Sequence, residues 1–162
     1  MSKGAIIVGY QGIGKSSLAN RESGYIDLES GNFWVNGNRA DDWYIPYCNI
    51  ALHLAEQGYR VFTSSHPVVT NHLSSIPRTV DLYACYPSFT LREQWISKLK
   101  RRYDDSRLEK DFKAWRNAEE KYNENIEALH CLSGFMPIII HDMGYSLRRC
   151  IEKAIAAKGT QE

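Results

Sequence analysis

A run of residues near the start of the chain has the types and spacing needed to hold phosphate groups. It reads Gly9-Tyr10-Gln11-Gly12-Ile13-Gly14-Lys15-Ser16 and matches the pattern G-x-x-x-x-G-K-[ST]. Glycines let backbone N–H groups turn toward phosphate oxygens, which a larger side chain would block. The lysine supplies a positive charge for the β- and γ-phosphates, and the serine hydroxyl supplies a ligand for Mg²⁺. The spacing therefore predicts a phosphate-binding loop that takes ATP with Mg²⁺.

The residues on both sides of this loop agree with that prediction. Ala5–Val8 is a short, largely β-branched run of the kind found in buried parallel strands, and Ser16–Ala19 can start a helix whose positive N-terminus faces the bound anion. A chance glycine-rich turn would lack this order of strand, loop and helix. The predicted nucleotide-binding residues are Gly9, Gln11, Gly12, Ile13, Gly14, Lys15, Ser16 and Ser17. Of these, Lys15 is also predicted to act in catalysis and Ser16 to bind the metal.

The composition fits one globular domain over residues 1–162. Apolar residues make up 43% of the chain and charged residues 24%, and no apolar run approaches the length that crosses a membrane. A net charge of +1 supplies no broad field for a phosphate backbone, which disfavours nucleic acid as an obligatory partner. The first residues lack the apolar core of a signal peptide, so we expect a cytoplasmic protein with no membrane attachment. Four widely spaced cysteines are expected to be reduced thiols.

Short apolar runs that alternate with helical patterns predict the architecture. The runs are Ala5–Val8, Tyr25–Leu28, Tyr59–Thr63, Thr79–Cys85 and Phe135–Asp142. Each connection is long enough to cross back over a sheet, as parallel neighbours require. The pattern therefore predicts an α/β fold with a three-layer, doubly wound parallel sheet of five strands.

Two carboxylates follow the second predicted strand. Asp27 and Glu29 lie where the strands of an open parallel sheet deliver residues to a ligand crevice, and strand alternation sends both to the same side. We expect Asp27 to act in catalysis, next to Mg²⁺ or an acceptor hydroxyl, and Glu29 to contact the acceptor as a reserve base. The competing interpretation is a solvated strand end.

A polar, aromatic stretch at about residues 31–47 is the predicted acceptor-binding segment. Its rings suit a planar acceptor such as a nucleobase, and Arg39 could hold an acceptor phosphate. Alternatively, the rings only pack the next helix onto the sheet, and Arg39 faces solvent. His66, after the third predicted strand, is a further acceptor-binding candidate, and its alternative role is structural or solvent-facing.

A basic stretch at about residues 98–116 is the predicted lid-like segment. Two helical patterns meet there at a short polar hinge, Tyr103–Arg107. Guanidinium groups can bind several oxygens of a moving phosphoryl group, so we expect Arg101 and Arg102 to act in catalysis and Arg107 to bind the nucleotide. The competing interpretation is a solvated basic face at a helix C-terminus. Arg116 is a further candidate of the same kind.

With these residues, the chain resembles the small P-loop kinases of the nucleotide and nucleoside kinase group, which includes adenylate, shikimate and gluconate kinases. Its Phe62–His66 stretch is also similar to gluconate kinases, and its Tyr25–Ser30 stretch to a bacterial and phage branch of P-loop kinase-like proteins. The resemblance implies a P-loop NTPase fold with strand order 2-3-1-4-5, with Asp27 near Mg²⁺ or the acceptor and with Arg101, Arg102 and Arg107 in a lid. No recognisable acceptor motif follows the third strand, which leaves the acceptor unassigned.

These features predict Mg-ATP-dependent phosphoryl transfer to a small-molecule acceptor, a nucleoside or nucleotide, by a monomer or homodimer. One alternative is a nucleotide-binding switch or sensor, although no Asn-Lys-x-Asp motif for guanine is present. The other is a kinase that acts on nucleic-acid ends or bases, which only the basic stretch supports. Whether Asp27, Glu29 or His66 acts as the base stays open.

Overall fold

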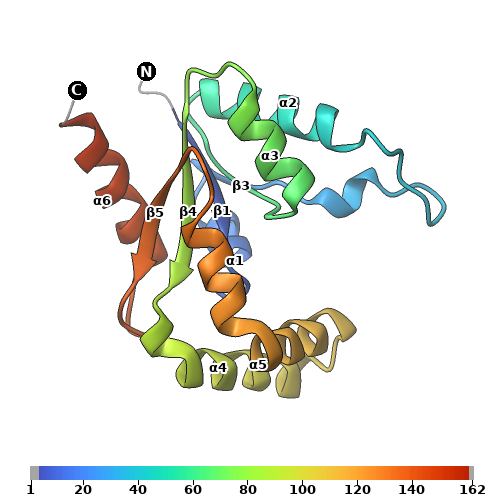
Figure 1. Cartoon of the computed structure of the whole chain (residues 1–162), viewed down its shortest axis with the longest axis vertical. Coiled ribbons are helices and arrows are strands. Elements are labelled where there is room, and N and C mark those ends of the chain that lie inside the picture. Colours follow the sequence, from blue (N-terminus) through green and yellow to red (C-terminus); the bar gives the residue numbers. More distant parts are fainter. Residues whose placement is uncertain (1–3, 161–162) are drawn as a thin grey trace. The chain divides into compact units, whose positions relative to one another are not determined.

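In the computed structural model, which describes residues 4–160, the strands form one five-stranded sheet in the order β2-β3-β1-β4-β5 (Figure 1). The strands are β1 (Ala5–Gly9), β2 (Tyr25–Asp27), β3 (Arg60–Thr63), β4 (Asp81–Pro87) and β5 (Phe135–Ile140). All run parallel, with helices on both sides of the sheet. The predicted fold class and strand order are therefore confirmed. The predicted fourth strand began two residues too early and ended two too soon, and the fifth ended two residues too late.

The helices that connect these strands are α1 (Lys15–Arg21), α2 (Tyr44–Glu56), α3 (Pro67–Ser75), α4 (Arg92–Ser106), α5 (Glu109–His130) and α6 (Leu147–Gly159). Two short 3₁₀ helices, η1 (Ser30–Phe33) and η2 (Phe89–Leu91), lie in the loops. Along residues 4–160, no helix has the length and apolar character needed to cross a membrane.

The chain divides into two compact units. One contains the chain up to Gly9, Lys15–Ala84 and Leu132–Met136, and the other contains Tyr10–Gly14, Cys85–Cys131 and the chain from Pro137 onward. The glycine loop thus has its two ends in the first unit and its middle in the second. Its middle is held by different elements from those that hold Lys15 and Ser16.

In the first unit, α2 packs an apolar stripe against the sheet. Tyr47, Cys48, Ala51 and Ala55 are fully buried, at the spacing that places them on one helix face, and they pack with Ile6 and Val61 of the strands. The two alanines let the helix approach β1 and β3 closely. Burial raises the pKa of the Cys48 thiol to about 12, so this thiol stays protonated near neutral pH.

Gly4 marks the closest backbone approach in this unit. Its amide donates to the Ala55 carbonyl at 2.8 Å, and a Cβ at Gly4 would lie 1.8 Å from the carbonyl oxygen of Tyr59. Because backbone atoms cannot move aside cheaply, we expect Gly4→Ala to lower the free energy of unfolding by about 2–4 kcal/mol. Urea unfolding would measure the loss. Gly24→Ala is the control, since its Cβ would meet nothing within 4 Å, and equal midpoints for the two variants would contradict the prediction.

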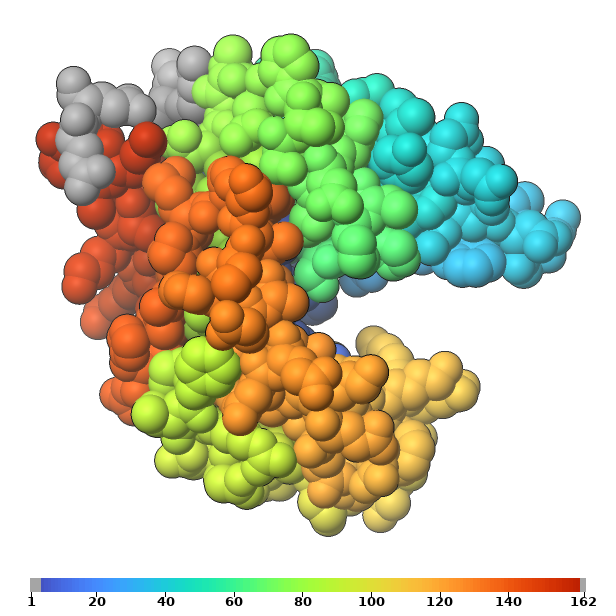
Figure 2. Space-filling model, in the orientation of Figure 1, coloured from blue at the N-terminus to red at the C-terminus, as the bar shows by residue number. Residues whose placement is uncertain are grey.

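In the second unit, α4 and α5 form a hairpin whose atoms, yellow-green to orange in Figure 2, make one packed surface. The predicted hinge Tyr103–Arg107 is wrong in extent, because α4 continues to Ser106 and only Arg107 and Leu108 lie between the two helices; Arg107 has φ of 58°. Asp111, although 4% exposed, fixes this turn: it accepts from the Ser106 hydroxyl and pairs with Arg102 Nε at 3.0 Å. A buried carboxylate needs such partners, and here they lock the hairpin.

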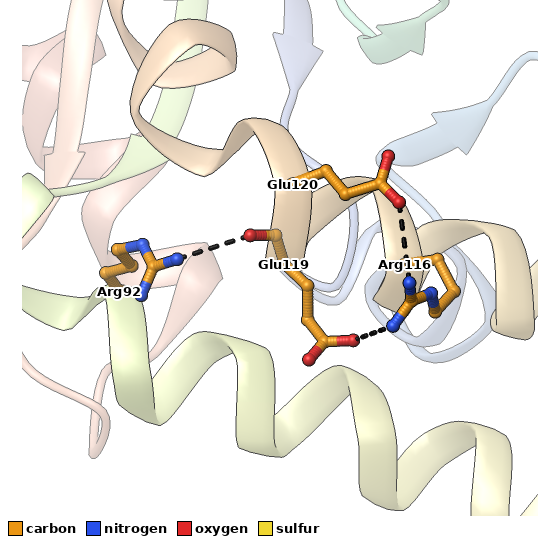
Figure 3. Close-up of polar contacts among 4 residues, drawn as sticks. All are labelled: Arg92, Arg116, Glu119 and Glu120. Atoms are coloured by element: carbon orange, nitrogen blue, oxygen red, sulfur yellow. Dashed lines mark hydrogen bonds and ion pairs between the residues drawn. The ribbon is translucent and has the colours of Figure 1, made fainter.

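Helix α5 bends at Lys121, whose φ of −137° and ψ of 22° are not helical. Such a residue interrupts the ladder of backbone hydrogen bonds, and the Glu119 carbonyl just before it accepts from Arg92 at 3.2 Å (Figure 3). Arg116 pairs with the Glu119 and Glu120 carboxylates at 2.7 and 3.5 Å. The guanidinium of this additional lid candidate is therefore engaged by its own helix.

Candidate active site

The backbone of the glycine loop explains why glycines stand at two of its positions. Gly12 has φ of 86° and Gly14 has φ of 105°, a region that side chains with a Cβ rarely adopt. At Gly12 a Cβ would also lie 2.9 Å from Leu99 Cδ2 and 3.3 Å from Trp95 Nε1. Among the described residues, neither the Gly12 nor the Gly14 amide has a hydrogen-bond acceptor. Both remain able to donate to a ligand.

The first unit places three predicted site residues near one another in the fold. Lys15 and Ser16 begin α1, and Asp27 ends β2. The Lys15 ammonium donates to the Gly9 carbonyl at 3.2 Å, and the Ser16 hydroxyl donates to Asp27 Oδ2 at 2.7 Å. The structure thus brings together the two residues predicted to bind the metal.

This pair suits Mg²⁺ better than metals that need a full protein cage. Within residues 4–160, no group of three or more histidine, cysteine, aspartate or glutamate side chains could hold a metal ion. Magnesium prefers oxygen ligands and keeps several waters, so one or two protein oxygens together with phosphate oxygens satisfy it. The Ser16 hydroxyl and the Asp27 carboxylate form a donor set of this type.

The ends of β2 and β3 are tied together by a buried tyrosine. The Tyr47 hydroxyl donates to the Leu28 carbonyl at 2.7 Å and accepts from the Ser64 amide at 2.8 Å. Burial raises the pKa of Tyr47, so the phenol keeps the proton that it donates. Tyr47 therefore fixes the backbone next to Asp27. Sequence reasoning treated it only as one aromatic of the acceptor-binding segment.

Strand alternation does not extend to Glu29. Strand β2 ends at Asp27, and Glu29 is an exposed residue that precedes η1 with a side chain that makes no capping hydrogen bond. Since alternation holds only within a strand, it does not set the direction of this carboxylate. The prediction that Glu29 shares the side of Asp27 therefore no longer has support from alternation, and it stays a prediction.

The acceptor-binding segment contains a tight turn followed by a stacked arginine. Val35 and Asn38 pair antiparallel across Asn36 and Gly37, which both have positive φ, as in a two-residue hairpin turn. Next to this turn, the Arg39 guanidinium carbon lies 3.7 Å from the Trp43 ring centroid and 4.7 Å from that of Trp34. Trp43 is buried, whereas Trp34 is 51% exposed.

Stacking against the Trp34 and Trp43 rings therefore fixes the orientation of the Arg39 guanidinium. Among the described residues, its N–H groups have no hydrogen-bond acceptor and no carboxylate partner. A guanidinium that stacks by its faces presents its N–H groups at its edges, which is the geometry that binds carboxylate or phosphate through two bonds.

His66 has a structural role that sequence reasoning left open. Its Nδ1 accepts from the Val68 amide at 3.3 Å and so caps the start of α3, and its ring meets the Trp43 ring edge-on at a centroid distance of 6.1 Å. With Nδ1 as acceptor, a neutral imidazole carries its proton on Nε2. The side chain is exposed, and Nε2 is the ring nitrogen that remains able to contact the predicted phosphoryl acceptor.

The second unit holds the middle of the glycine loop. The Trp95 indole N–H donates to the Gln11 carbonyl at 2.9 Å, and the Tyr145 hydroxyl donates to the Ile13 carbonyl at 2.7 Å. The Gln11 side chain donates to the Ala114 carbonyl of α5 at 3.0 Å. The side chain of Gln11, a predicted nucleotide-binding residue, is therefore bound to α5, and only its backbone forms part of the loop.

The predicted lid arginines lie at the end of α4 and have different surroundings. Arg102 is paired with the buried Asp111, so it also stabilises the hairpin. Arg107 lies with its guanidinium carbon 5.3 Å from the Tyr103 ring centroid, and Arg101 is exposed. Of the remaining predicted loop residues, Ser17 is exposed on α1.

No family model matches the chain, and no curated protein matches it. Among solved structures, the chain is similar to a gluconokinase from Sinorhizobium meliloti 1021, at 15% sequence identity and a TM-score of 0.48, over 95% of this chain and 90% of that one. A likeness at this level says nothing of activity or substrate, so both rest on the residues of this chain.

Sequence reasoning missed the residues that hold the loop. Trp95 is fully buried in α4, and helical periodicity can predict such burial, but it does not show that the indole N–H meets a loop carbonyl. Tyr145 lies in the loop between β5 and α6, where no local pattern specifies a partner. The sequence signal for these contacts was weak: tryptophan and tyrosine stand at apolar positions, and their N–H and O–H groups usually find a hydrogen-bond partner when buried.

Proposed function

We propose that the protein transfers a phosphoryl group from Mg-ATP to a small acceptor, a nucleoside or nucleotide. The observation that carries the proposal is the Ser16–Asp27 pair, 2.7 Å apart, at the start of the helix that follows a loop with two positive-φ glycines. A chance glycine-rich turn requires neither a hydroxyl nor a carboxylate at these places.

The proposed roles follow from the chemistry of each group. Lys15 and the loop amides hold the β- and γ-phosphates, and Ser16 and Asp27 hold Mg²⁺, which when bound neutralises phosphate charge. Arg101 and Arg107 cover the transferred group, and Arg102 assists them while it pairs with Asp111. Asp27 orients an acceptor hydroxyl, and Glu29 and His66 are the other candidates for the base.

The proposed acceptor contacts come from the segment that precedes α2. Trp34 offers an exposed ring face on which a planar base can stack, and Arg39 offers unengaged N–H groups for an anionic substituent. A nucleotide has both features, whereas a nucleoside has only the first.

The deciding experiment has two stages. Calorimetry with Mg²⁺ present first measures uptake of ATP and GTP by the purified chain. A pooled screen of nucleosides, nucleotides, sugars and sugar acids with labelled ATP then shows which compound gains phosphate. If no purine triphosphate binds, the proposal fails entirely. If ATP binds and is hydrolysed but no compound gains phosphate, a nucleotide-dependent switch replaces the kinase.

Arg39 supplies a sharper prediction for the acceptor found by the screen. If that acceptor is anionic, we expect Arg39→Gln to raise its KM about 10- to 100-fold, because a charge-assisted hydrogen-bond pair is lost. The KM for ATP should stay unchanged. Steady-state kinetics with each substrate varied separates the two constants. Arg148→Gln, an exposed arginine on α6, is the control, and an acceptor KM that stays constant in Arg39→Gln would rule out this contact.

A further inference from the structure

The two ring donors that hold the glycine loop support each other. The rings of Trp95 and Tyr145 stack with centroids 5.9 Å apart and planes 25° apart. Trp95 is fully buried in α4, and Tyr145 lies in the loop between β5 and α6. Their donor atoms therefore reach the glycine loop from one preformed pair of rings.

The peptide geometry shows what these donors do to the loop. In a trans peptide, the carbonyl of one residue and the amide of the next point in opposite directions. Because Trp95 holds the carbonyl just before Gly12, the Gly12 amide points away from the indole. Tyr145 directs the Gly14 amide in the same way. These are the two loop amides that have no acceptor among the described residues.

The glycines themselves cannot set these directions. Glycine takes positive and negative φ with similar ease, so a peptide next to it can turn over at small cost. The motif supplies the freedom that the loop needs, but it does not select one orientation. At Gly12 and Gly14, the selection comes from the two hydrogen bonds to the preceding carbonyls.

Lys98 extends the same cluster. Its ammonium donates to the Tyr145 hydroxyl at 3.0 Å and lies 4.5 Å from the Trp95 ring centroid and 5.1 Å from that of Tyr145. A cation that donates to a hydroxyl oxygen strengthens that hydroxyl as a donor. Burial raises the pKa of Tyr145, which keeps its proton in place, and burial together with Arg102 and Arg101 lowers the pKa of Lys98.

We propose that Trp95 and Tyr145 are positioning residues for the triphosphate: they fix the Gly12 and Gly14 amides in the direction that receives phosphate oxygens, and Lys98 holds Tyr145 in place. The inference rests on the proposed nucleotide binding but not on the identity of the acceptor. The ring pair thus acts on the nucleotide through the backbone and not by contact.

Tyr145→Phe tests this directly, because it keeps the stacked ring and removes only the hydroxyl. We expect its affinity for Mg-ATP, measured by calorimetry, to fall about 5- to 30-fold, since one loop carbonyl loses its donor. Magnesium tripolyphosphate has the phosphates but no base, and its affinity should fall by a similar factor. A loss confined to Mg-ATP would mean that Tyr145 contacts the base, and would overturn the proposal.

The matched control is Tyr122→Phe. The Tyr122 hydroxyl donates to the Ser88 carbonyl at 2.8 Å, so this variant loses the same kind of bond in the same unit, but to a carbonyl outside the glycine loop. Its ring, which packs edge-on against Tyr10 with centroids 5.7 Å apart, is kept. We expect both variants to lower thermal stability by similar amounts, and only Tyr145→Phe to lose nucleotide affinity. Equal affinity losses in the two variants would indicate general destabilisation and would contradict the proposal.

A second readout needs no ligand. With ¹⁵N-glycine labelling, the chain has 11 glycine amides to follow, and we expect exchange broadening in Tyr145→Phe to concentrate on Gly14 and in Trp95→Phe on Gly12. Unchanged signals at both positions would overturn the inference. Should wild type bind Mg-ATP without phosphorylating any acceptor, the kinase proposal fails while the positioning role stands. Should it bind no triphosphate, both fail.

Discussion

Lys15→Ala is expected to lower phosphoryl transfer by on the order of 10³-fold while the fold is retained. The ammonium is the one cation that the loop motif places at the β- and γ-phosphates, and alanine removes this charge without substituting another. Its hydrogen bond to the Gly9 carbonyl, 3.2 Å long, is part-buried and holds the end of β1. The free energy of unfolding should therefore change by about 1 kcal/mol or less.

The measurement is turnover with the acceptor from the screen, together with urea unfolding of the same preparation. Lys153→Ala, an exposed lysine on α6, is the matched control and should turn over at the wild-type rate. Transfer by Lys15→Ala at the wild-type rate would refute the phosphate-loop assignment. A collapse of stability would show instead that the lysine is structural.

The fold was predictable because its signals are local. The β-branched run before the loop, the glycines and the helix that follows all lie within a short stretch of chain, and alternation of strands with helices restricts the topology to a parallel sheet. The order β2-β3-β1-β4-β5 then came from the resemblance to small kinases and is observed. Strand ends were less predictable, because the same residues can extend a strand or begin a loop.

The partners of individual side chains were not predictable in the same way. Trp95, Tyr47 and Asp111 lie on helices, but their partners are Gln11, Leu28 and Arg102, which no local pattern specifies. Periodicity predicts that a residue is buried, not what its polar tip meets. At Glu29 the difficulty is a different one: strand alternation was applied beyond the end of β2, where it no longer sets the direction of a side chain.

The two halves of the loop illustrate why site residues need tertiary information. The sequence motif is continuous, yet the first unit contains Gly9, Lys15 and Ser16 and the second contains Tyr10–Gly14. The amides that would hold phosphate are oriented by α4 and the loop after β5, while the hydroxyl and carboxylate that would hold the metal are set by α1 and β2. Each group of residues can therefore be disturbed separately by mutation.

Asp27→Asn should separate the metal function from the phosphate function. Asparagine keeps an oxygen that can accept from Ser16, so the 2.7 Å contact and the stability should be largely retained. The negative charge is lost, and we expect turnover at a fixed Mg²⁺ concentration to fall by on the order of 10²- to 10³-fold, with half-saturation moved to higher Mg²⁺. Affinity for the metal-free nucleotide should stay near that of wild type, because Lys15 and the loop amides are unchanged.

Titration of activity with Mg²⁺ measures this shift, and Asp81→Asn, a carboxylate at the start of β4, is the control. A double-mutant cycle with Ser16→Ala decides whether the pair works as one site. If both oxygens serve the same ion, the double variant loses little more than either single variant, because the second change removes a ligand from a site already lost. Strictly additive losses would mean that Ser16 and Asp27 act independently, and an unchanged Mg²⁺ dependence in Asp27→Asn would remove this residue from the metal site.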